Sequence, residues 1–138
     1  MATKIIQHHE QFDFELFFQN ISLQYIGLDY RDYLAFLHAE GEKHSFIGHA
    51  ECDNRVENAI GNAIASEHGA DIINRASTVM IMIIHSSKAV RPLTMNEMQY
   101  LNEFTSGFSK ECELIWGIAE DSSLENSVKA IVFANIAE

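Results

Sequence analysis

Two aspartates at the start of a predicted helix are the residues of this chain with the clearest chemical potential. Asp29 and Asp32 stand three positions apart in the stretch Gly27-Leu28-Asp29-Tyr30-Arg31-Asp32. An amphipathic pattern follows, so both carboxylates lie near a helix N-terminus, where the helix dipole favours their ionised form. Such a pair can orient a water molecule or a metal ion. The structural alternative is an N-cap plus a first-turn carboxylate, which many helices carry for the dipole alone.

The helix that would hold these aspartates is one of several elements that hydrophobic periodicity predicts. We expect helices over residues 30–39, from an Asn54-x-x-Glu57 capping pattern to about His68-Gly69, and over 93–108, where Thr94 and Glu97 fit a capping box. Strands are expected over 45–51, 78–85, 113–119 and 127–136. The strand over 78–85 is apolar on both faces, which suits a central position, and the last two strands should be antiparallel neighbours. The fold class is therefore α+β, a two-layer arrangement of an about four-stranded sheet with packed helices.

The N-terminal residues 1–24 are expected to form a separate, helical segment. Phe14, Phe17, Phe18 and Ile21 lie at helical spacing, although residues 12–16 also alternate as a strand would. The helix would have an aromatic face for a partner or a second copy to cover. The adjacent His8 and His9 would point apart, which favours a solvated terminus over a metal site.

Composition excludes several classes of function. The net charge is -11, from 20 acidic against 9 basic residues without a basic cluster, so neither nucleic acid nor an anionic membrane is an expected partner. The 2 cysteines have no metal-ligand spacing, which is typical of a reduced, intracellular protein. No signal-peptide core is present, and the longest apolar run, 79–84, is too short to span a bilayer, so we expect a cytoplasmic location.

Other side chains give weaker indications of a site. The later histidines lack the i, i+4 pairing of a helical metal site, and no nucleophile motif is present, so we expect no metal and no cofactor. Asn54 is expected as a cap and Arg55 as a solvent-facing charge. The histidines in question are His38, His44, His49, His68 and His85.

The stretch Gly27 to Asp32 resembles the Asn-x-Asp-x-x-Asp synergy loop of FtsZ, the bacterial tubulin-like cell-division GTPase. The resemblance covers roughly residues 25 to 136, and later elements follow the family's order through the Ile115-Trp116-Gly117 strand, Asp121 and the last strand. It implies an FtsZ C-terminal-like domain over 25–138 and, within 1–24, a remnant of the family's inter-domain helix. The residues that continue the match are Gly41, Gly48, Ala50, Asn54, Arg55, Glu57, Ala59, Ala63, Ile64 and Ser66.

The resemblance also implies how such a domain would act. The family's nucleotide-binding half, with its Gly-Gly-Gly-Thr-Gly-Thr-Gly loop, is not in this sequence. The chain would then be no enzyme by itself, and at most contribute to GTP hydrolysis in trans. Asp29 and Asp32 would position the attacking water beside GTP held by another chain. Gly27 stands where the family has Asn, so one polar contact to the nucleotide is absent. The expected partner is a tubulin-like GTPase or a second copy, and capping of a filament is a further possibility.

Two other functions stay open at this point. One is a small α+β ligand-binding or enzymatic oligomer with a chorismate-mutase-like layout. A buried basic residue at a pocket, with Arg55, Arg75 and Arg91 as candidates, would favour it. The other is a degenerate relative with a role unrelated to division. Filament contact predicts an exposed loop over 27–32 with both carboxylates free, whereas ligand binding predicts a concave polar pocket elsewhere.

Overall fold

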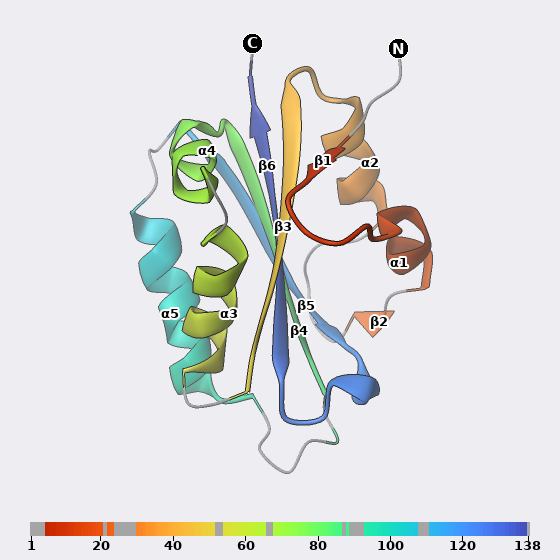
Figure 1. Ribbon diagram of the computed structural model, residues 1–138, viewed down its shortest axis with the longest axis vertical. Helices are drawn as coiled ribbons and strands as arrows, with labels where there is room; N and C mark the ends of the chain where they lie inside the picture. The colour runs from red at the N-terminus through yellow and green to blue at the C-terminus, as the bar shows by residue number, and fades with distance from the viewer. Residues whose placement is uncertain are drawn as a thin grey trace.

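A six-stranded sheet lies between two layers of helices in the computed structural model of the protein (Figure 1). The structure describes residues 5–20, 22–23, 30–51, 54–65, 68–86, 88, 93–107 and 111–137. The strand order is β1-β3-β6-β4-β5-β2. In chain order the elements are β1 (Ile5–Gln7), α1 (Phe14–Asn20), β2 (Ser22–Leu23), α2 (Tyr30–His38), β3 (Glu42–Ala50), α3 (Arg55–Ile64), α4 (Gly69–Arg75), β4 (Thr78–His85), α5 (Met95–Ser106), β5 (Glu113–Glu120), a 3-10 turn (Ser122–Leu124) and β6 (Val128–Ile136).

The centre of the sheet is formed by β4 and β6, which pair antiparallel with each other. Both strands are apolar along nearly their whole length, and successive side chains point to opposite faces. Val79, Ile81 and Ile83 enter the core beneath α3, α4 and α5, whereas Met80 and Met82 enter the core beneath α1 and α2. Both faces of the sheet therefore need a cover of helices.

The first face is covered by α3 at very short range. Val56 and Ile60 of α3 are fully buried against the sheet. Gly48 of β3 allows this approach, since a Cβ there would lie 2.2 Å from the carbonyl oxygen of Ala59 and 2.4 Å from the amide nitrogen of Ala63. The absence of a side chain at position 48 therefore sets the distance between α3 and the sheet.

The second face is covered by aromatic side chains of α1 and α2. Phe14 and Phe18 of α1 are 3% and 2% exposed, and with Tyr33 and Phe36 of α2 they surround Phe133 of β6. The prediction that a partner or a second copy would hide the aromatic face of the N-terminal helix is wrong for these two phenylalanines, because the chain's own sheet covers them.

The α+β class and all four predicted strands are confirmed, together with the helices that begin at positions 30, 55 and 95. The short edge strands β1 and β2 raise the number of strands to six, and the helices form a layer on each face rather than on one. The last two strands are not neighbours, because β4 lies between β5 and β6. The helix predicted to end near His68-Gly69 is divided into α3 and α4. Within the described ranges, every helix is too short or too polar to traverse a bilayer.

Gly48→Ala tests the contact between α3 and β3. We expect the substitution to lower the free energy of unfolding by about 1–3 kcal/mol, because the new methyl group must push backbone atoms of α3 away. Gly61→Ala is the matched control, since a Cβ at this position of α3 would meet no atom within 4 Å beyond the helix's own backbone. The control should raise stability by about 0.5–1 kcal/mol through helix propensity. Urea unfolding measures both, and equal effects would contradict the close contact.

Candidate functional site

The predicted aspartate pair falls at the N-terminal end of α2. Asp32 lies in the first helical turn and is partly exposed, whereas Gly27 and Asp29 lie outside the described residues. The orientation of α2 is fixed by Tyr33, which stacks on Phe18 of α1 with ring centroids 4.7 Å apart. Burial, followed by the nearby carboxylates of Glu15 and Asp13, raises the pKa of Tyr33 to about 12, so its hydroxyl stays neutral. The role of the two aspartates stays a prediction.

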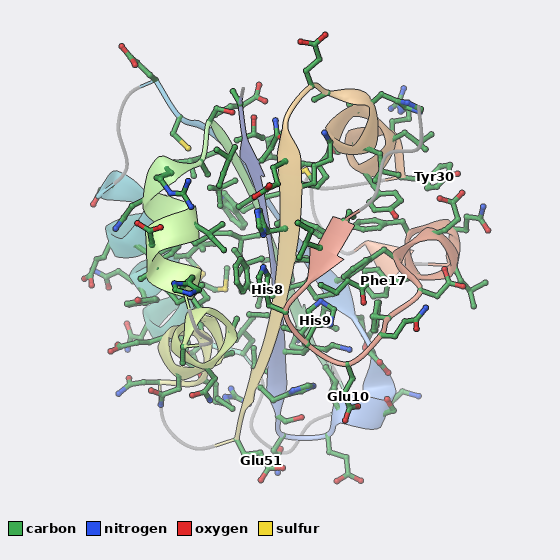
Figure 2. All side chains as sticks on the ribbon, turned by 45° about the horizontal axis from the view of Figure 1, so that its top comes forward. His8, His9, Glu10, Phe17, Tyr30 and Glu51 are labelled. Carbon is green, nitrogen blue, oxygen red and sulfur yellow. The ribbon has the colours of Figure 1, made fainter. Side chains whose placement is uncertain are left out.

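A second contact ties the first turn of α2 to α1. The hydroxyl of Tyr30 donates a hydrogen bond to a carboxylate oxygen of Glu15. Figure 2 shows Tyr30 on α2 and Phe17 on α1 on the same side of the sheet. The start of α2 is thus held by neighbouring packing, which is what a positioned carboxylate requires.

Arg55 was expected to face solvent, and the structure shows the opposite. Its side chain is 3% exposed and forms a bidentate ion pair with Glu97 of α5, with Nε to Oε2 at 2.7 Å and Nη2 to Oε1 at 2.6 Å. Its Nη1 also donates to the carbonyl of Asn126 at 2.8 Å. Arg55 therefore joins α3, α5 and the loop before β6.

The two capping predictions near this ion pair have different outcomes. Thr94 and Glu97 form the predicted capping box at the start of α5. Asn54 stands at the N-cap of α3 as predicted, but in a left-handed conformation (φ 58°) and without a side-chain cap hydrogen bond. Glu97 instead accepts a hydrogen bond from the backbone N–H of Arg55 at 3.3 Å, so one carboxylate serves the first turns of both helices.

A polar cavity of about 220 Å³ lies beside this ion pair, between α3 and α5. Its wall includes Glu57, Glu97, Glu103 and Tyr100. The ligand-binding hypothesis predicted a concave polar pocket of this kind. It also required a basic side chain that points into the pocket. The guanidinium of Arg55 is directed to Glu97 and Asn126, and the acidic wall disfavours an anionic ligand.

The N-terminal histidines are ordered against the sheet, so the prediction of a solvated terminus is wrong. His8 Nε2 lies 2.8 Å from His44 Nδ1, and His44 Nε2 lies 2.6 Å from a carboxylate oxygen of Glu42. The ring of His8 also stacks on Phe46 at 4.7 Å between centroids. Figure 2 shows His8 and His9 at the end of β1, beside β3. Burial, and then the charge of His44, lowers the pKa of His8.

His9 contacts the opposite face of β3. Its Nε2 lies 2.8 Å from the hydroxyl of Ser45, and its Nδ1 lies 2.6 Å from the carbonyl of Glu10. In the described part of the chain, no three His, Cys, Asp or Glu side chains are grouped to hold a metal ion. The histidines therefore act as hydrogen-bonding and stacking groups that attach the N-terminal residues to β3.

Removal of the Arg55 guanidinium should strongly destabilise the folded protein. We expect Arg55→Met to lower the free energy of unfolding by about 3–5 kcal/mol, because Glu97 would stay largely buried without its partner. Arg75→Met is the matched control, since Arg75 pairs with Asp71 at 3.1 Å with side chains 56% and 65% exposed. That control should cost less than about 1 kcal/mol. Chemical denaturation distinguishes the two, and a cost below that of the control would contradict a structural ion pair.

The same ion pair predicts a dependence of stability on pH. Hydrogen bonds from Arg55 lower the pKa of Glu97 to about 2 from 4.5. A carboxyl group with a lowered folded-state pKa stabilises the protein above its unfolded pKa, and this is lost as pH falls through the folded value. We expect the free energy of unfolding of wild type to exceed that of Glu97→Gln by about 3 kcal/mol at neutral pH. This difference should shrink as the pH falls from 4.5 to about 2. Urea midpoints across this range test it; a constant difference would contradict the linkage.

Comparison with known proteins identifies the fold. No family model matches the sequence, and no curated protein matches it. Among solved structures, an empty FtsZ dimer from M. jannaschii matches 80% of this chain with a TM-score of 0.62 and 23% identity. A GTPγS-form protofilament of TubZ from Bacillus thuringiensis serovar israelensis matches 88% with a TM-score of 0.65 and 17% identity. The chain spans 31% and 32% of the length of these proteins. The predicted resemblance to a part of FtsZ is thus confirmed, and the described residues have the fold of a partial, C-terminal-like domain of the tubulin-like proteins FtsZ and TubZ.

Proposed function

We propose that this protein acts by protein-protein contact in tubulin-like filament assembly, with cell division as its setting. The observation that carries the proposal is the likeness of 80% to 88% of the chain to about a third of FtsZ and TubZ, the latter solved as a protofilament. The partner is a tubulin-like GTPase or a second copy of this chain. The chain itself is not a GTPase in this proposal.

One mode of action is to offer Asp29 and Asp32 to GTP held by the partner. Support comes from Asp32, which lies partly exposed in the first turn of α2, and from the packing of Tyr33 that holds this turn. Carboxylates at this position would orient the attacking water, which is a contribution of position and charge rather than of covalent chemistry. Gly27, in place of the family's Asn, leaves one contact to the nucleotide unmade.

The other mode is capping of a filament end. A domain that offers one of two filament faces can join a filament but does not extend it. Capping changes the polymer without any need for the two aspartates, so the two modes are separable by mutation.

The competing hypothesis of a small ligand-binding oligomer draws no support from Arg55. Arg55 is the buried basic residue that the hypothesis required, but its guanidinium hydrogen-bonds to Glu97 and to the carbonyl of Asn126. Arg75 is exposed and paired with Asp71, and Arg91 lies outside the described residues.

The deciding experiment titrates this protein into a full-length tubulin-like GTPase from the same organism. GTP turnover and light scattering are followed together. We expect a dose-dependent change in at least one of them. If the aspartates act in trans, turnover rises, and Asp29→Ala/Asp32→Ala loses most of this rise, because a misplaced nucleophile costs on the order of 10²-fold.

Asp71→Ala is the matched control, since Asp71 also stands in the first turn of a helix, α4, remote from α2 in the sequence. It should behave as wild type. An effect on light scattering that persists in the double variant assigns capping instead of catalysis in trans. No change in turnover or scattering at high molar excess would refute the filament role.

A further inference from the structure

Two basic side chains lie opposite each other near the end of the pairing between β3 and β6. His49 of β3 and Lys129 of β6 are directly paired in the antiparallel register. They share the face of Ile47 and Ile131, which is the face covered by α1 and α2. Protonation of His49 would place like charges directly opposite each other, which destabilises a sheet, and the charge of Lys129 accordingly disfavours it.

The loop between β1 and α1 folds over this pair and forms a cavity of about 270 Å³. Its wall includes His9, Phe12 and Ile47, together with His49 and Lys129. The ammonium of Lys129 lies 4.4 Å from the centre of the Phe12 ring. The cavity thus combines two apolar side chains, Phe12 and Ile47, with basic groups that can orient a ligand.

The loop that closes the cavity is held in place by side-chain hydrogen bonds. The amide of Gln7 binds the backbone of Phe12 twice, since it donates to the carbonyl at 3.1 Å and accepts from the N–H at 3.0 Å. His9 uses both ring nitrogens, one toward Ser45 and one toward the carbonyl of Glu10. The cavity is therefore preformed. His9 forms part of its wall, but both of its ring nitrogens are already engaged.

Lys129 and His49 are the basic side chains of the wall that His9 leaves available, beside the amide of Gln11. Within the described part of the chain, neither side chain makes a hydrogen bond, and the ammonium of Lys129 lies over the aromatic face of Phe12. Burial lowers the pKa of Lys129, although Asp121 opposes this, and burial followed by the charge of Lys129 lowers the pKa of His49. Lys129 is half-buried and His49 is exposed, and an anion placed between them would favour the charged forms of both.

The wall also carries one acid, Glu10, whose place further along the loop is seen in Figure 2. Asp121 acts on Lys129 from the end of β5, but its own carboxylate accepts hydrogen bonds from the amide and hydroxyl of Ser123 at 3.0 and 2.6 Å. The carboxylate of Asp121 is thus engaged in the turn before β6. A ligand with a single negative group can approach Lys129 and His49 while its body contacts Phe12.

We propose that the cavity between the β1–α1 loop and the His49–Lys129 pair binds a small organic anion, a carboxylate or phosphate monoester with an apolar body. The anionic group binds the ammonium of Lys129 and an N–H of His49. The apolar body packs against Phe12 and Ile47. This site is on a different element from Asp32 and does not depend on the proposed filament role.

The test uses phenyl phosphate, benzoate and inorganic phosphate, with benzyl alcohol as the neutral analogue. Each is titrated into the full chain and followed by the NMR signals of His49, Phe12 and the Lys129 amide. We expect saturable binding of phenyl phosphate or benzoate, at least about tenfold tighter than that of inorganic phosphate or benzyl alcohol. Equal affinities for the aromatic anion and inorganic phosphate would overturn the assignment of an organic ligand.

Lys129→Met removes the charge and keeps the length of the side chain. It should weaken binding of the aromatic anion at least about tenfold, whereas Arg75→Met, which removes an exposed charge on α4, should leave it unchanged. Thermal unfolding without ligand should show Lys129→Met about as stable as wild type, because Met can keep the packing of this side chain on Phe12. Absence of saturable shifts in wild type up to about 10 mM, or unchanged affinity in Lys129→Met, would refute the site.

Discussion

The apolar character of both faces of β4 and β6 is the constraint on which the rest of the structure depends. Six successive residues of β4, from Val79 to Ile84, are at most 1% exposed. Side chains on both faces of a strand can be buried only if each face has its own layer. One layer consists of α3, α4 and α5, and Gly48 allows α3 to pack closely on the sheet. The other must come from α1 and α2, which explains why the N-terminal residues belong to the core rather than to a separate surface (Figure 1).

Most of the helices and strands could be predicted because local patterns of apolar residues determine them. Partial alternation indicated β3 and the apolar runs indicated β4 and β6, while three- and four-residue spacing indicated α2, α3 and α5. The order of the strands could not be predicted in this way, since the insertion of β4 between β5 and β6 depends on contacts between distant residues. β1 and β2, with 3 and 2 residues, are too short to show a period and exist only through their neighbours.

The candidate site was predictable only in its sequence-local part. Asp32 at the start of α2 follows from the helix pattern around it. Arg55 was misassigned because its partner Glu97 is 42 positions away, and a charge beside an apolar Val56 carries no local sign of burial. His8 was misassigned for the same reason, since its contact with His44 spans 36 positions. The opposition of His49 and Lys129 likewise requires the register of β3 against β6. Hydrophobic periodicity cannot predict a site that is formed by residues far apart in the sequence.

The cover over Phe133 also limits how a partner could meet this protein. Phe14 and Phe18 already fill that face, and exposing two such side chains would cost about 3–6 kcal/mol. A partner would gain little by displacing α1. Surfaces that need no such rearrangement include the first turn of α2 and Trp116 on β5, which is 41% exposed. A partner that binds there leaves α1 and the core beneath it in place.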